Sequence, residues 1–178
     1  MSTTRPEPRA TAPAAPPTNR GDREAPIVLS MGDPCGIGPE IIVKALAAPL
    51  SARCVVVGDV AILRRAASQC GLALPLLVLD APGEAGDAPP GCLPAWQPPG
   101  LPRALSALPM GRVHADAGRA AITCIEAAAA LARDGRAAAL VTAPIHKQAL
   151  AAAGSPFAGH TEMLQALAAR GGTPPRGS

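Results

Sequence analysis

Residues 27–40 read Ile-Val-Leu-Ser-Met-Gly-Asp-Pro-Cys-Gly-Ile-Gly-Pro-Glu. The apolar run 27–31 predicts a short buried strand, and the glycines after it allow the backbone to turn sharply. Pro39 suits the first position of a helix, where its missing N–H costs nothing. A strand, a glycine loop and a helix in this order are typical of a parallel α/β sheet.

The rest of the chain repeats this alternation of strand and helix, which predicts βαβ units and a mostly parallel sheet with flanking helices. The sequence predicts strands at 27–31, 53–58, 76–79 and 139–142, an edge strand at 101–108, a loop at 80–100, and helices at 39–47, 59–70, 115–133, 144–153 and 161–169. Residues 1–25 are expected to form a disordered tail. Residues 171–178 (Gly-Gly-Thr-Pro-Pro-Arg-Gly-Ser) look like a linker, so the folded part is expected over 26–170.

Composition excludes several classes of protein. The net charge is only +3 and no basic cluster stands out, so neither nucleic acid nor a membrane surface is an expected partner. No apolar stretch is long enough to span a bilayer, and no secretory signal is visible. The five cysteines are odd in number and lack a CxxC pair, which disfavours disulfides and a zinc site and favours the cytoplasm.

Three motifs could carry chemistry. The loop 32–38 brings glycines and Asp33 to a helix start, where free N–H groups could face an anion. The segment 141–147 (Val-Thr-Ala-Pro-Ile-His-Lys) ends a strand and puts His146 and Lys147 in the first turn of a helix, at the sheet edge where α/β proteins bind ligands. In 157–162 (Phe-Ala-Gly-His-Thr-Glu), Thr161 suits an N-cap beside His160.

Each motif also has an ordinary structural explanation. The glycine loop could be a tight turn without a ligand. Its spacing of glycines matches neither the Rossmann fingerprint nor the P-loop. Lys147 could be a solvated helical lysine, even though the chain otherwise uses arginine almost everywhere. His160 could be an incidental histidine in a capping turn.

Together and in this order, MGDPCGIGPEI, VTAPIHK and GHTEML resemble the 4-hydroxythreonine-4-phosphate dehydrogenase family of vitamin B6 synthesis. The resemblance implies an α/β fold similar to the isocitrate and isopropylmalate dehydrogenases. It implies NAD(P)-dependent, metal-assisted oxidation of 4-phosphooxy-L-threonine to a 2-amino-3-oxo acid that decarboxylates. Cys35 stands where the family has alanine.

The resemblance also assigns roles to residues. His160 and Thr161 match the family's substrate-binding pair. For His146 and Lys147 the resemblance suggests only contact with an anion. Gly32, Asp33, Gly36 and Gly38 match its ligand loop. The metal ligands are expected beyond Arg170, so none is expected in this chain, and the full-length form is expected to be a homodimer.

Family members are considerably longer, so we expect this chain to be the N-terminal half of such an enzyme, truncated at its C-terminus. Two alternatives stay open. One is a non-catalytic remnant, and the other is a related dehydrogenase of a sugar-acid phosphate or of an aromatic dihydrodiol.

Overall fold

The computed structural model describes residues 25–48 and 53–169. The expected tails at 1–25 and 171–178 therefore lie, apart from Ala25, outside the described residues. The described chain forms one five-stranded sheet in the order β3-β4-β2-β1-β5, and every pair of neighbouring strands is parallel. The strands are β1 (Ile27–Ser30), β2 (Cys54–Val57), β3 (Leu76–Leu79), β4 (Leu93–Trp96) and β5 (Ala139–Thr142). The predicted α/β class is confirmed.

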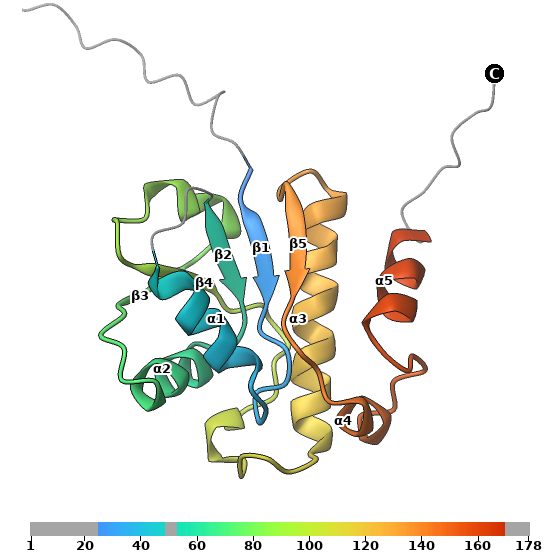
Figure 1. The fold of residues 1–178 in the computed structure, drawn as a ribbon. Helices are drawn as coiled ribbons and strands as arrows, with labels where there is room; N and C mark the ends of the chain where they lie inside the picture. Colours follow the sequence, from blue (N-terminus) through green and yellow to red (C-terminus); the bar gives the residue numbers. More distant parts are fainter. Residues whose placement is uncertain (1–24, 49–52, 170–178) are drawn as a thin grey trace, which may run out of the picture.

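Helices flank the sheet on both faces (Figure 1). Their bounds are α1 (Gly38–Ala47), α2 (Val60–Gln69), α3 (Ala115–Arg133), α4 (Lys147–Ala152) and α5 (His160–Ala169), with 3₁₀ turns η2 (Pro82–Asp87) and η3 (Leu105–Ala107). Helices α1 and α2 pack together on one face and α3 crosses the other (Figure 1). This arrangement is what parallel strands require, because each crossover must return over a face of the sheet.

The core is built from small and branched aliphatic side chains. Val55, Val56 and Val57 on the central strand β2 are fully buried. A strand covered on both faces is expected to be a continuous apolar run, which is what the sequence Cys-Val-Val-Val provides. On α3, alanines meet the sheet, so the long helix lies close to the strands.

The prediction for residues 80–108 was wrong. The strand in this region is β4, inside the segment that we expected to be a loop, and the expected edge strand 101–108 contains only η3. Leu93 and Ala95 are fully buried, and β4 lies between β3 and β2. The segment 80–100 was expected to be a loop because of its composition, which is rich in proline and glycine.

The register explains how Pro94 is accommodated. The Leu93 amide donates to the carbonyl of Pro75, on the β3 side, so the next residue faces the β2 side. Pairing of β4 with β2 begins only at Ala95, opposite Val56. The missing N–H of Pro94 therefore falls before that ladder starts and leaves no gap in it.

A second, smaller cluster holds the last two helices. Ile125 of α3, Leu150 of α4 and Met163 of α5 are buried together. At Gly118 the two helices α3 and α4 approach so closely that an added Cβ would lie 2.0 Å from the carbonyl oxygen of Ala149. This contact fixes α4, and with it the segment that precedes α4, against the body of the domain.

Candidate functional site

The glycine loop after β1 packs directly against the segment that follows β5. The Asp33 amide donates to the carbonyl of Pro144 at 3.0 Å. Gly32 has φ +76°, and a Cβ there would lie 2.3 Å from the same oxygen. A Cβ on Gly38 would lie 2.6 Å from the carbonyl oxygen of Met31. Two of the predicted ligand-loop glycines are thus explained by close backbone packing, whether or not a ligand is bound.

The loop itself is a short turn ordered by Asp33. Its side-chain Oδ1 accepts from the Cys35 amide at 2.9 Å, and its backbone carbonyl accepts from the Gly36 amide at 3.1 Å. Asp33 is 5% exposed, whereas Gly36 is partly open to solvent. Aspartate in such a turn bonds to the backbone two residues ahead. The buried carboxylate therefore serves the loop, and Gly36 is its most accessible glycine.

Two groups outside the loop hold it in place. Arg65 on α2 donates from Nη2 to the carbonyl of Pro34 at 2.7 Å and from Nη1 to the carbonyl of Ser106 at 3.2 Å. The Gly111 amide donates to the carbonyl of Cys35 at 2.8 Å. Neither contact was predicted from the sequence. Nothing in the local sequence around position 65 distinguishes this arginine from its solvent-exposed neighbours.

Lys147 lies in the first turn of α4 as predicted, whereas His146 lies just before the helix. Helix α4 begins at Lys147, and His146 is its N-cap residue, with an extended backbone and a carbonyl that accepts from the Leu150 amide at 3.0 Å. Pro144 does not start the helix, because its carbonyl is already used by Asp33. Both His146 and Lys147 are exposed at the carboxyl edge of β5.

The third motif is also shifted by one residue. Helix α5 begins at His160, so Thr161 is an exposed residue of the first turn and not the N-cap. The carbonyl of Gly159 accepts from the Met163 amide, which starts the helix one residue earlier than predicted. The Nε2 atom of His160 is buried and has no hydrogen-bond partner among the described residues.

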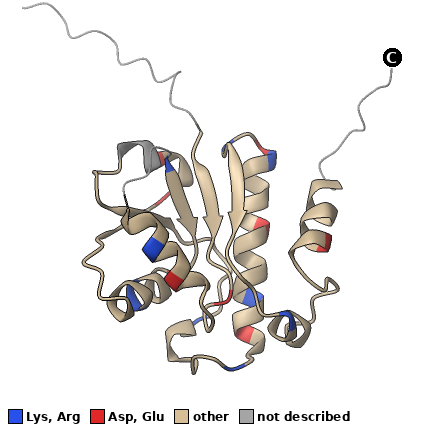
Figure 2. Ribbon diagram, in the orientation of Figure 1, with Lys and Arg blue, Asp and Glu red and all other residues tan. Residues whose placement is uncertain are grey.

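The structure brings all three motifs to one edge of the sheet. The glycine loop touches residues 143–144, and a Cβ built on Gly159 would lie 3.9 Å from Cε of Lys147. Lys147 therefore reaches the residue next to His160. Figure 2 shows that the charged residues lie on helices and connecting segments, and the described strands carry none. Lys147 is the cation at the junction of the second and third motifs.

The thiol of Cys35 is not activated by its place at a helix start. Burial raises the pKa of Cys35 first of all, the nearby Asp33 raises it further, and Arg65 opposes both. The side chain is 2% exposed. Cys35 thus remains a protonated thiol near neutral pH. It fills space in the turn, which agrees with the alanine that the family has at this position.

A metal site does not form among the described residues. No group of three histidine, cysteine, aspartate or glutamate residues there lies close enough to hold an ion. The helices in this part of the chain also include none that is long and apolar enough to cross a membrane.

Comparison with known proteins agrees with this geometry. The family model described as pyridoxal phosphate biosynthetic protein PdxA matches residues 51–173. The 4-hydroxythreonine-4-phosphate dehydrogenase of Trichlorobacter lovleyi is 40% identical over 144 residues, which cover 79% of this chain and 42% of that protein. The D-threonate 4-phosphate dehydrogenase of Cupriavidus necator is 43% identical over 153 residues, which cover 83% of this chain and 43% of that protein.

Solved structures give the same result. The crystal structure of 4-hydroxythreonine-4-phosphate dehydrogenase from Klebsiella pneumoniae matches with a TM-score of 0.73 and 39% identity, over 83% of this chain and 44% of that one. The chain spans less than half the length of the relatives that it matches. By sequence and by fold, it belongs to the PdxA family of pyridoxal phosphate biosynthetic proteins.

Proposed function

We propose that this chain provides the substrate-holding edge of an NAD(P)-dependent dehydrogenase that oxidises a phosphorylated four-carbon hydroxy acid. The observation that carries the proposal is the convergence of the three motifs. The glycine loop is wedged against Pro144, and Lys147 reaches Gly159 beside His160. Segments that lie more than a hundred residues apart in the sequence thus form one surface at the carboxyl edge of the sheet, where α/β enzymes bind ligands.

His160, Thr161 and Lys147 are the groups that we propose to meet the substrate. The buried Nε2 of His160 has no hydrogen-bond partner within residues 25–48 and 53–169, and a buried polar atom of this kind is costly unless another molecule completes its hydrogen bond. Thr161, the next residue along the chain, is exposed. Lys147 places an ammonium group within reach of the same substrate and would attract its phosphate or carboxylate. For His146, which is exposed at the start of α4, we propose anion contact only.

The cofactor and the metal are proposed from the family alone. A bound nicotinamide dinucleotide would accept the hydride from the secondary alcohol, and a divalent metal would polarise the oxygen. The described residues do not form a metal site, so we derive no step through the metal. The chain's own residues would bind the anion and orient the hydroxyl-bearing carbon, and they leave Gly36 partly exposed at the edge of the site.

The first candidate substrate is 4-phosphooxy-L-threonine, whose 2-amino-3-oxo product would then lose carbon dioxide. The second is D-threonate 4-phosphate, which is favoured by the Cupriavidus necator relative of that name. Both carry a phosphate on the fourth carbon and differ in the amino or hydroxyl group on the second. Lys147 can pair with the group that the two candidates share, so it does not choose between them.

The test is titration calorimetry of the purified 178-residue chain with each of the two compounds. We expect binding of both, weakened about tenfold or more in His160→Ala and in Lys147→Met. His114→Ala is the matched control, because the Nε2 of His114 is also buried without a partner in the described part of the chain, but His114 lies at the start of α3, outside the three motifs. Failure to bind either compound, or equal loss in the control, would count against the proposal. Formation of reduced nicotinamide on addition of cofactor and a divalent metal reports whether this chain also turns the substrate over.

A further inference from the structure

We propose that Arg65 is a positioning residue that joins the glycine loop and the segment 104–111 into a single rigid unit at the edge of the site. The inference rests on the proposed function only in taking that loop as the ligand-facing one. The role is assigned by two hydrogen bonds from one guanidinium to two separate stretches of backbone, namely to Pro34 and to Ser106.

The geometry requires a forked donor. Arg65 extends from α2, whose neighbouring residues Ile62, Leu63, Ala66 and Ala67 are buried in the core, so its base is fixed. From there, Nη2 reaches the carbonyl of Pro34 and Nη1 the carbonyl of Ser106. A guanidinium presents several N–H groups in a fixed plane, and this lets one side chain hold two acceptors in a defined relative position.

The two stretches that Arg65 joins have little regular structure of their own. The loop 32–36 is a turn ordered by Asp33, and the segment 104–111 contains only the short η3. Leu105 is buried beside α2, and the Gly111 amide donates to the carbonyl of Cys35. Arg65 and Gly111 therefore bind consecutive carbonyls, those of Pro34 and Cys35, and fix the direction of the peptide that leads to Gly36.

The hydrogen bonds to the carbonyls of Pro34 and Cys35 also affect the exposed side of the loop. The carbonyls of residues 34 and 35 already accept from donors outside the loop, Arg65 and the Gly111 amide. The first N–H groups of α1 have no intrahelical acceptor, and these two nearby carbonyls are engaged elsewhere. On the other side, Asp33 and Gly32 are held by Pro144. The segment at Pro144 thus supports the loop on one side, and Arg65 together with Gly111 supports it on the other.

Amide hydrogen exchange on the purified chain tests this role without depending on substrate or cofactor. The probes are the amides of Cys35, Gly36 and Gly111, and those of Ala107 in η3 and of its C-cap residue Leu108, all of which donate to protein acceptors. In Arg65→Met we expect all five to exchange about tenfold faster or more, with the amides of β1 and α3 unchanged. Arg64→Met is the matched control, because it removes the same charge from the exposed adjacent position on α2.

The conservative variant Arg65→Lys separates positioning from charge. Lysine keeps the charge and most of the stem but lacks the planar fork, so we expect one of the two stretches to stay loosened. Full protection in Arg65→Lys, or equal loosening in Arg64→Met, would overturn the proposal. So would an Arg65→Met variant that loosens the whole sheet, since that would make Arg65 a general stability residue. Failure of the binding test above would leave these exchange results unaffected.

Discussion

At the scale of single residues, the glycine loop is determined by what surrounds it. Gly32 and Gly38 are the positions where backbone meets backbone, at Pro144 and Met31. The sequence predicted a sharp turn at these glycines correctly. It could not reveal that their neighbour is the segment after β5, because that contact joins residues more than a hundred positions apart.

Gly32→Ala should therefore be costly for two reasons that a control can separate. It would force a positive φ on alanine and bring Cβ to 2.3 Å from the Pro144 oxygen, so we expect a loss of about 2 kcal/mol or more in unfolding free energy. Gly71→Ala has a similar φ of +65° but no atom within 4 Å, and should cost only about 1 kcal/mol. Urea denaturation of both variants measures the difference. Equal losses would mean that the contact with Pro144 contributes nothing.

A second residue-scale prediction concerns the buried thiol of Cys124 on α3. Burial above all, together with the charge of Asp59 and against a smaller lowering by the Met31 backbone, raises its pKa from the usual value of 9.0 to about 12. Between pH 9 and about 12, the Cys124 thiol loses its proton in the unfolded chain and retains it in the folded chain. Stability contributed by this group is therefore present below pH 9 and is lost as the pH rises above it.

We expect the unfolding free energy to fall with pH above 9 by up to about 1.4 kcal/mol per pH unit from this residue. Cys124→Ala should flatten the slope, even though removing the side chain lowers stability by a constant amount. Cys92→Ala, at a half-buried position, is the control. Denaturant titrations at several pH values give the slopes, and identical slopes in wild type and Cys124→Ala would contradict the prediction.

At the scale of elements, the sequence predicted the strands and helices that have strong apolar patterns and missed those set by tertiary contacts. The run Cys-Val-Val-Val of β2 and the alanine-rich α3 were predicted to within a residue or two. Strand β4 was missed because it lies in a segment rich in proline and glycine, and only its register with β2 shows how Pro94 fits into a strand. The starts of α4 and α5 moved because the carbonyls of Pro144 and Gly159 are committed to particular amides.

The contact between α3 and α4 gives an element-scale prediction. In an exposed helix, alanine is about 1 kcal/mol more favourable than glycine, so a loss on Gly118→Ala must come from packing. The added Cβ would lie 2.0 Å from the Ala149 oxygen and would push α4 away, so we expect a net loss of about 2 kcal/mol or more. Glu126→Ala, on the exposed side of α3, should change stability by less than about 0.5 kcal/mol.

This substitution should also weaken the site, because α4 carries Lys147. The same calorimetric titration that tests the proposed function would then detect weaker binding of the phosphorylated compounds in Gly118→Ala. Unchanged binding together with lower stability would indicate that α4 adjusts its position without moving the lysine.

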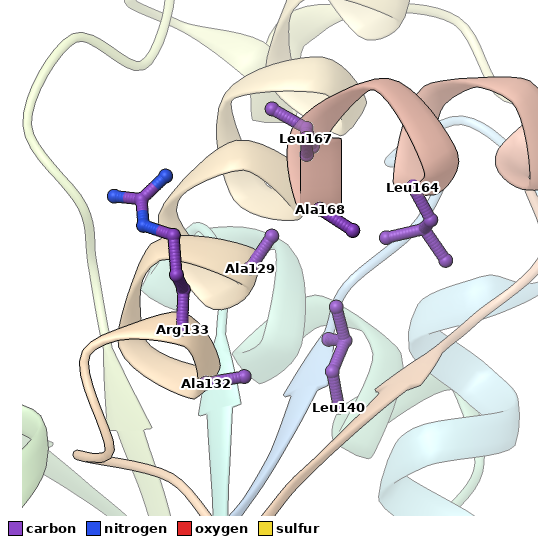
Figure 3. Close-up of a pocket in the computed structure, with 7 residues that line it drawn as sticks. All are labelled: Ala129, Ala132, Arg133, Leu140, Leu164, Leu167 and Ala168. Atoms are coloured by element: carbon purple, nitrogen blue, oxygen red, sulfur yellow. The ribbon is translucent and has the colours of Figure 1, made fainter. Parts of the chain in front are cut away.

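At the scale of the whole molecule, the sheet formed by the described residues ends in two edge strands, each beside a hollow lined mostly by apolar residues. Strand β3 at one edge borders a surface hollow lined by Leu72, Leu74 and Leu76, with Arg64 and Ser68 beside them. Strand β5 at the other edge borders a groove of 410 Å³ between α3 and α5. Figure 3 shows that the groove is lined almost entirely by apolar side chains, among them Leu140, Leu164 and Leu167, with Arg133 at its side. The site residues of α4 and α5 follow directly after this apolar edge.

The position of β5 at the edge of the sheet was not predictable from composition. The sequence identifies β5 as an apolar strand, but only the strand order places it outermost, next to a helix that stands away from the sheet (Figure 1). The convergence of the three motifs has the same origin. Each motif was visible locally, whereas their meeting depends on β1 and β5 being neighbours in the sheet.

The exposed valines of the two edge strands allow a matched test of self-association. Val141 on β5 is 49% exposed and Val78 on β3 is 48% exposed, so a lysine at either position can reach solvent at little cost in stability. Open apolar edges promote association between chains, and a charge on the edge opposes it. We expect Val141→Lys and Val78→Lys each to lower concentration-dependent association, because both edge strands lie beside a hollow lined mostly by apolar residues. Sedimentation over a range of protein concentrations measures both variants, and association that is unchanged in both would show that the edge strands do not drive contacts between copies of the chain.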